Sequence, residues 1–182
     1  MRYALLLALL AAVAATACVS NKSQAQQSND ALNKGLQAHA AGRLDEAATD
    51  YREVLKHDPQ NKYAYYNLGL IDQTQNRPVA AENNYRIALS TDPNFSPVLF
   101  NLAVLRRDQG DTQGAIQYFR QDVSIDPNNA KAHLNLGLVL RSAGQQAEGD
   151  TEIQHALQLD PKLTVPAGTP APPPAASPTP GR

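Results

Sequence analysis

The chain has 182 residues, of which 42% are hydrophobic and 18% are charged, and this composition excludes a wholly disordered protein. Sixteen Lys and Arg against 17 Asp and Glu give a net charge of −1, which excludes the strongly basic surface typical of nucleic-acid-binding domains. One cysteine, four histidines and no tryptophan exclude a disulfide framework and a Cys/His zinc module.

Residues 1–17 have the three parts of a secretory signal: a positive charge at Arg2, an apolar run, and small residues before Cys18. The apolar run is too short for a membrane span. The sequence therefore predicts that the chain is exported. The segment from Ala15 to Cys18 resembles a bacterial lipobox, which implies that Cys18 is lipidated and anchors the protein to a membrane.

The lipoprotein resemblance also implies a location. Val19 after the cysteine implies the outer membrane in a Gram-negative cell, on the periplasmic or cell-surface side. Lipobox sequences prefer Leu where this chain has Ala15, so cleavage after Ala17 without lipidation stays open. Residues 18–27 are expected to form a flexible tether, because the stretch 21–29 has almost no apolar residue.

The middle of the chain is a sequence repeat with a period of 34 residues. Asp-Pro pairs recur at residues 58–59, 92–93, 126–127 and 160–161. Small residues recur with the same period, 23 residues before each Asp: Gly35, Gly69, Ala103 and Gly137. Later positions carry Ala47, Ala81 and Ala115, followed four residues on by Tyr51, Tyr85 and Phe119. This pattern resembles the tetratricopeptide repeat, a helix-turn-helix unit of the same length.

The tetratricopeptide resemblance implies an all-α fold, an α-solenoid of four repeats over residues 28–61, 62–95, 96–129 and 130–163. The turn between the helices of each repeat is expected at Gly42, Asn76, Gly110 and Gly144, because Gly and Asn tolerate a left-handed backbone. Proline after Asp is expected to end each second helix. The sequence places Asp122 on a solvated rim, and Gly149 and Asp150 at a solvent-facing end.

The first helices of such a stack line its concave groove. An asparagine precedes the small residue by two positions in every repeat: Asn33, Asn67, Asn101 and Asn135. An amide can both donate to and accept from a peptide backbone, so this ladder predicts a site for an extended peptide. It resembles the asparagine ladder of the O-linked glucosaminyl transferases. The alternative is that Asn is simply common at this position of the repeat.

Apolar residues flank the ladder on the same helices. The predicted peptide-binding residues are Tyr66, Leu70, Phe100, Val104, Leu134 and Leu138, with Arg107, Lys131 and Arg141 at the rim. An exposed apolar patch of this kind usually marks a partner site. The alternative is that these side chains pack mostly against one another. The positive charges that clamp the acidic C-termini of cytosolic chaperones are largely absent, which argues against that ligand.

No glycine-rich phosphate loop, Gly-x-Ser-x-Gly elbow or His-Glu-x-x-His motif occurs in the chain. The four histidines fall in four different predicted helices, so the sequence predicts no catalytic residue, no metal site and no cofactor. The Pro- and Ala-rich residues 164–182 are expected to form an extended tail, either a spacer or a dispensable end.

These features together predict an exported, lipid-anchored interaction scaffold that binds a protein or peptide partner of the cell envelope. The resemblance extends to tetratricopeptide lipoproteins that serve pilus assembly, outer-membrane protein insertion or cell-wall enzyme regulation. The alternative function is a structural spacer or assembly factor that acts through its lipid and tail. Neither reading involves nucleic acid.

Overall fold

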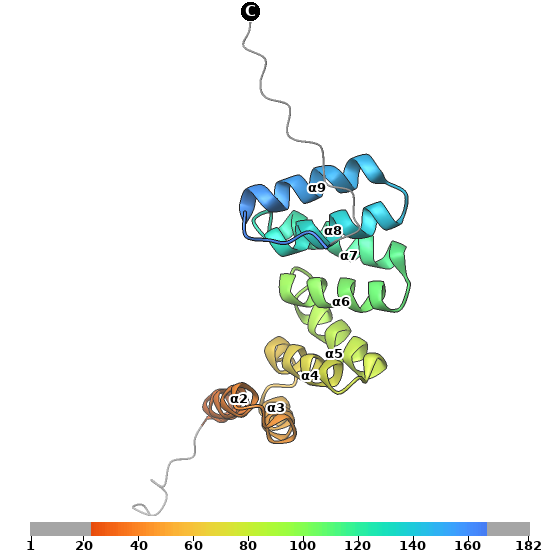
Figure 1. Cartoon of the computed structure of the whole chain (residues 1–182). Helices are drawn as coiled ribbons and strands as arrows, with labels where there is room; N and C mark the ends of the chain where they lie inside the picture. The colour runs from red at the N-terminus through yellow and green to blue at the C-terminus, as the bar shows by residue number, and fades with distance from the viewer. Residues whose placement is uncertain (1–22, 167–182) are drawn as a thin grey trace, which may run out of the picture. The chain divides into compact units, whose positions relative to one another are not determined.

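The computed structural model of the chain describes residues 23–166, and over this range it contains α-helices and no strand (Figure 1). This confirms the all-α fold class. The helices are α2 (Gln24–Ala40), α3 (Leu44–His57), α4 (Lys62–Thr74), α5 (Pro78–Thr91), α6 (Ser96–Asp108), α7 (Thr112–Ile125), α8 (Ala130–Ser142) and α9 (Gln146–Leu159).

The chain divides into two compact units, one ending at Ala64 and the other beginning at Tyr65. Helices α2 and α3 belong to the first unit. The second unit contains most of α4 and all of α5 to α9. The predicted signal segment, Cys18 and most of the predicted tail lie outside the described residues.

The turns between paired helices lie where the sequence predicted them. The residues at the four turns have positive φ: 74° at Gly42, 56° at Asn76, 79° at Gly110 and 81° at Gly144. A side chain other than that of Gly or Asn is strained in this conformation. The left-handed residue lets the chain reverse directly after the first helix, which places the second helix antiparallel to it.

The second helix of each repeat ends immediately before an Asp-Pro pair, as predicted. The aspartate side chain then organises the next turn, because Asp92 accepts a hydrogen bond from the Asn94 backbone N–H at 3.1 Å. Asp126 and Asp160 do the same for the backbone N–H groups of Asn128 and Lys162. Proline ends the helix and aspartate shapes the loop that begins the next repeat.

The predicted tether at residues 18–27 is wrong for its described part, because α2 begins at Gln24. Ser23 caps the helix by accepting a hydrogen bond from the Gln26 N–H at 3.2 Å. Gln and Ala are good helix formers even without apolar neighbours. Burial of Ser28 and Ala31 ties the extra turn to the rest of the first unit.

Each helix pair is closed by a large side chain that lies against a small one. A Cβ atom added to Gly35 would lie 2.7 Å from the ring of Tyr51, and one added to Gly69 would lie 2.4 Å from the ring of Tyr85. Phe119 packs with Ala103 in the α6–α7 pair. The small residues therefore make room for the aromatic rings that fill the core.

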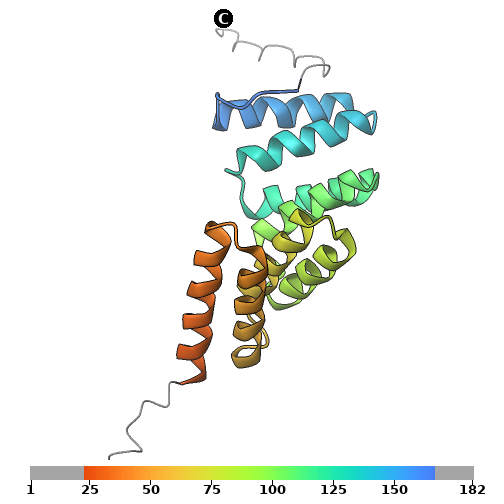
Figure 2. The ribbon, with the colours of Figure 1, turned by 60° about the horizontal axis from the view of Figure 1, so that its bottom comes forward.

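The last pair departs from this scheme, and it corrects the expectation for Gly149. A Cβ atom added to Gly137 would lie 2.6 Å from the backbone oxygen of Gly149, so two glycines bring α8 and α9 into backbone contact. Gly149 is buried, not solvent-facing, because Ile153 occupies less space than the Tyr or Phe of the other pairs. Figures 1 and 2 show α8 and α9 side by side.

The second correction concerns Asp122, which is fully buried instead of lying on a rim. Its carboxylate accepts hydrogen bonds from Ser96 Oγ at 2.6 Å and from Asn129 Nδ2 at 3.4 Å. Burial raises the pKa of Asp122, while the Ser96 hydrogen bond opposes that rise. The carboxylate thus joins the start of α6 to the loop before α8.

The first described residues of the predicted tail also pack. Leu163 and Val165 lie against a core cluster formed by Leu134, Ile153 and Ala156. They cover the end of the last repeat where a further helix would otherwise stack. None of the helices described here has both the length and the apolar character needed to cross a bilayer.

Candidate binding face

The predicted groove residues of the second unit lie on the first helices of its repeats, and we call this set the A-helix face. It comprises Tyr66, Asn67 and Leu70 of α4, Phe100, Asn101, Val104 and Arg107 of α6, and Lys131, Leu134, Asn135 and Leu138 of α8. Asn33 belongs to the first unit, where it is exposed on α2.

The aromatic residues of the A-helix face are half-buried. The ring of Tyr66 contacts Tyr85 at a centroid distance of 6.3 Å and Phe95 at 5.4 Å. Phe100 meets Phe119 edge-on at 5.7 Å. Each ring therefore helps to close its own helix pair and stays partly exposed, so both the packing alternative and the patch describe part of these side chains.

The second apolar row behaves in the same way. Leu70, Val104 and Leu138 are half-buried and pack against the cores of their own helix pairs. Leu134 is nearly buried, at 8% exposure, because Leu163 and Val165 share its cluster. The apolar part of the face is therefore most accessible along α4 and α6.

The asparagine ladder is held by hydrogen bonds within the chain. Asn101 Nδ2 donates to the Pro97 carbonyl at 2.7 Å, and Asn135 Nδ2 donates to the Lys131 carbonyl at 2.8 Å. Arg107 Nη1 donates to Asn135 Oδ1 at 2.7 Å. These bonds use one N–H group and fix the plane of each amide, which gives the ladder a defined orientation.

The ladder also connects successive repeats. The Tyr66 side chain is hydrogen-bonded to Asn101 of the next repeat, and burial raises the pKa of the Tyr66 hydroxyl more than this bond lowers it. The Arg107–Asn135 bond makes the corresponding link between α6 and α8. Asn67 differs from these two residues because it is buried, at 8% exposure.

The three predicted rim cations are placed differently. Lys131 is exposed, and Arg107 is exposed but pairs with Asp108 at 2.9 Å. Arg141 is buried between α8 and α9, where its Nε and Nη2 atoms both lie 2.5 Å from Asp150 Oδ1. Arg141 therefore does not reach the rim that the sequence assigned to it.

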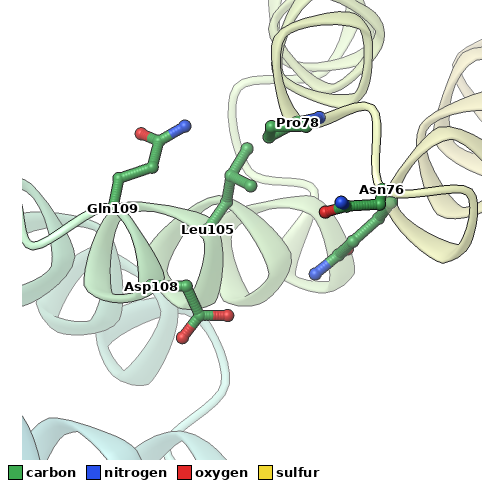
Figure 3. Close-up of a pocket in the computed structure, with 6 residues that line it drawn as sticks. Asn76, Pro78, Leu105, Asp108 and Gln109 are labelled. Carbon is green, nitrogen blue, oxygen red and sulfur yellow. The ribbon is translucent and has the colours of Figure 1, made fainter.

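Sequence reasoning missed a small pocket of about 260 Å³ at the α4–α5 turn (Figure 3). Asn76 and Pro78 face the last turn of α6, which contributes Leu105, Asp108 and Gln109. No motif spans these positions, because the pocket forms only when the turn of one repeat meets the helix of the next. Its size suits a single side chain better than a cofactor.

Sequence reasoning also missed two ion pairs at matching positions of successive repeats, in which the acidic and the basic residue exchange places. In one repeat Asp72 accepts from Arg77 Nη2 at 2.6 Å and from Asn84 Nδ2 at 2.7 Å. In the next repeat, 34 residues on, Arg106 faces Asp111 at 3.6 Å and also pairs with Glu82. A comparison of the residues 34 positions apart would have revealed that Asp72 and Arg77 correspond to Arg106 and Asp111.

The sequence matches the family described as TPR repeat over residues 35–76 and 105–144, and that described as tetratricopeptide repeat over residues 130–163. No curated protein sequence matches the chain.

Similar solved structures include PilF of Pseudomonas aeruginosa, with 24% identity, a TM-score of 0.70 and coverage of 78% of this chain and 65% of that one. MamA of Desulfovibrio magneticus RS-1 has 20% identity, a TM-score of 0.68 and coverage of 75% and 77%. YrrB, described as a TPR protein with an unusual peptide-binding site, has 19% identity, a TM-score of 0.65 and coverage of 72% and 68%. At these identities the structures share the fold.

Repeat matches, helix pairing and solved structures agree that the chain belongs to the tetratricopeptide repeat family, whose members typically act as non-enzymatic interaction scaffolds.

Proposed function

We propose that the protein is a non-enzymatic adaptor that binds an extended segment of a partner protein on the A-helix face. The observation that carries this proposal is the juxtaposition of half-buried aromatic rings on α4 and α6 with the oriented amides of Asn101 and Asn135. Apolar side chains of a partner would contact the rings of Tyr66 and Phe100 while its backbone meets the amides beside them.

The hydrogen-bonding capacity of the ladder supports this assignment. A carboxamide has two N–H groups and two oxygen lone pairs. The bond to the Pro97 carbonyl uses one N–H of Asn101, and the corresponding bond to Lys131 uses one N–H of Asn135. The second N–H of Asn135 can serve a peptide carbonyl without breaking its bond to Lys131, whereas the Asn101 amide is also bonded to Tyr66. Because the amides are already oriented, a ligand need not order them.

We also propose that the adaptor works at the cell envelope, anchored through Cys18. The support is the sequence pattern of residues 1–18, together with the export that such a pattern directs. Lipid chains at Cys18 would confine the A-helix face to the membrane vicinity, where a weak groove is effective because its partner is locally concentrated.

The binding proposal is tested by site-specific photocrosslinking in the native cell. A benzophenone amino acid replaces Val104 on the A-helix face, and a matched probe replaces Ile87, an exposed apolar residue of α5. We expect a discrete adduct from position 104 and none from position 87. Equal adducts from both positions, or none from position 104, contradict the proposal.

A paired substitution then tests the amides. Asn101→Ala with Asn135→Ala should lower the crosslinking yield by about tenfold or more, since each lost hydrogen bond contributes about 1 kcal/mol. Asn83→Ala is the matched control, because Asn83 is exposed on α5 away from the ladder. Unchanged yield in the double variant would favour the alternative function as a spacer acting through lipid and tail.

The anchor is tested separately by cell fractionation. Cys18→Ala should move the protein from the membrane fraction to the soluble exported fraction, because the acyl chains can no longer be attached. Retention of the variant in membranes would contradict the anchor and leave the binding proposal intact.

A further inference from the structure

Two histidines and a glutamate meet between α8 and α9. His133, Glu152 and His155 each offer a ligand atom, and these atoms lie within 4.8 Å of one another. The rings of His133 and His155 have centroids 4.2 Å apart. The sequence-based expectation that the histidines stay apart is wrong for this pair, because antiparallel pairing brings the first turns of α8 to the second half of α9 (Figure 2).

The arrangement follows from helix geometry. Glu152 and His155 are three residues apart, so they occupy the same face of α9. His133 takes the position that Tyr65 and Leu99 hold in the two preceding repeats, and this position points toward the partner helix. A histidine at a position that otherwise carries a large apolar residue, opposite a Glu-x-x-His pair, is the sequence signal of this cluster.

His133 lies between two hydrogen-bond acceptors. Its Nδ1 atom is 2.6 Å from Glu152 Oε2, and its Nε2 atom is 3.1 Å from the Pro127 carbonyl oxygen. A neutral imidazole donates from only one nitrogen, so it satisfies one acceptor and turns a lone pair toward the other. An imidazole that donates from Nε2 to Pro127 therefore turns the lone pair of Nδ1 toward Glu152, which is the arrangement a metal ion requires.

The group suits a metal ion for a second reason. Donation from Nε2–H to the Pro127 carbonyl fixes the tautomer that leaves Nδ1 free to coordinate, as backbone carbonyls do behind metal-bound histidines. His133 is buried, Glu152 is partly buried and His155 is exposed, so one side of the site is dry and the other opens to solvent. Solvent can thus supply the remaining ligands.

We propose that His133, Glu152 and His155 bind a divalent first-row transition ion, and that Zn²⁺ is the best fit. Two imidazole nitrogens and one carboxylate form a donor set that Zn²⁺ binds with three protein ligands and water. The ion would bridge α8 and α9 and stabilise the last repeat. This inference is independent of the A-helix face and of the anchor.

The required movements are small. Ligand atoms in a tetrahedral zinc site lie about 3.3 Å apart, given zinc–ligand distances of about 2.0–2.1 Å. The His133–Glu152 pair at 2.6 Å would open slightly to admit the ion. The exposed ring of His155 would turn inward, which changes only its own side-chain torsions.

The test is a titration of the full chain with Zn²⁺ alone, followed by calorimetry and by the imidazole ¹⁵N resonances. All proteins carry Cys18→Ser, because a free thiol is itself a zinc ligand. We expect one equivalent to bind, with the largest shifts at the ring nitrogens of His133 and His155. His155→Ala should weaken binding about tenfold or more, and its fold should be unchanged because the ring is exposed.

The matched control is His57→Ala, which removes an imidazole whose Nε2 atom lies 3.2 Å from Glu53 but which, among residues 23–166, belongs to no cluster of three possible metal ligands. Zinc affinity should be the same in this variant as in the Cys18→Ser parent. If His155→Ala binds as tightly as the parent, or if the shifts map to His39 and His57, the proposal is overturned. An absence of binding would likewise overturn the proposal.

Discussion

The α4–α5 and α8–α9 pairs solve one packing problem in two ways. In the former, Tyr85 fills the space above Gly69 and its hydroxyl donates to Gln73 at 2.9 Å. In the latter, Ile153 leaves less to fill, so Gly137 and Gly149 bring the helix backbones together. The position of Tyr85 and Ile153 can thus hold either an aromatic ring or a smaller aliphatic side chain. In the second case the facing residues are glycines, and the helices lie closer together.

The charged residues follow the same logic. Gln73 receives the tyrosine hydroxyl in α4–α5, and the matching residue of α8–α9 is Arg141. Ile153 offers no hydroxyl, so the buried Arg141 turns to Asp150. One substitution in a repeat therefore changes which contacts its neighbours make. The variants described below test this comparison.

The largest effect is expected from Asp150→Ala. Removing one member of a buried ion pair leaves Arg141 with an uncompensated charge, which should lower the free energy of unfolding by about 3 kcal/mol in a urea titration. The double variant Asp150→Ala with Arg141→Met should regain most of that loss, because no buried charge remains. Equal instability of the single and double variants would show that the pair contributes packing alone.

Gly137→Ala comes next. Its Cβ atom would meet the Gly149 oxygen at 2.6 Å, and a backbone atom cannot turn aside, so we expect a loss of about 2 kcal/mol after the gain in helix propensity. The Cβ atom of Gly69→Ala would instead clash with the Tyr85 ring, and the resulting loss of stability should be partly recovered by Tyr85→Leu. Ile153 Cγ1 also lies 2.6 Å from the added Cβ, so Ile153→Ala should rescue Gly137→Ala only in part, and full rescue in the same titration would contradict the backbone contact.

Tyr85→Phe should have a smaller effect, about 1 kcal/mol, because it removes one hydrogen bond to Gln73 and leaves the ring in place. Burial raises the pKa of Tyr85, as expected for a hydroxyl that stays protonated. Tyr51→Phe is the comparison in the first unit, where the Tyr51 hydroxyl lies 3.4 Å from His39 Nδ1. Thermal unfolding should show the smaller change for Tyr51→Phe, and the reverse order would refute the assignment.

The smallest effect concerns Asp122, which replaces the Ala88 and Ala156 of the two pairs compared above. Burial raises its pKa above the ordinary value of 3.8, so the folded state holds this proton more tightly than the unfolded chain does. Stability contributed by the protonated form is therefore lost as pH rises from about 4 through the folded pKa.

Asp122→Asn removes this ionisation. The stability of the variant relative to the wild type should therefore rise with pH over that interval and then level off, as read from urea midpoints. The charges of Asp126 and His133 also act on the Asp122 carboxyl group. Asp126→Asn therefore serves as the control for the effect of the Asp126 charge. A difference that stays constant from pH 3 to pH 7 would show that Asp122 titrates as it does in the unfolded chain.

The fold was predictable because its signals are local and repeated. Positive φ at Asn76 and the helix stop before Asp92 each follow from a single residue type. The starting point of α2 was not, because a polar Gln-rich stretch reads equally well as tether or helix until Ser23 and Ser28 are seen in place.

The placement of the candidate residues on one set of helices was predictable, their contacts were not, and their role in binding stays a prediction. Counting positions within the repeat placed Tyr66, Phe100 and Asn101 on one face. It could not reveal that Arg141 is buried, because this depends on the loss of volume at Ile153 twelve residues later. The His133–Glu152–His155 cluster was missed for a similar reason, since its members are joined by helix pairing and not by a motif.

The end of the last repeat bears on how this array could lengthen. Leu163 stands 68 residues, or two periods, after Phe95, and it meets Leu134 as Phe95 meets Tyr66. At Leu163 the chain thus follows the register that a fifth repeat would have. An inserted repeat could dock on the existing surface by continuing from Leu163, with no redesign upstream. In the described residues, Leu163 and Val165 pack on the α8–α9 pair at the place where such a repeat would stack.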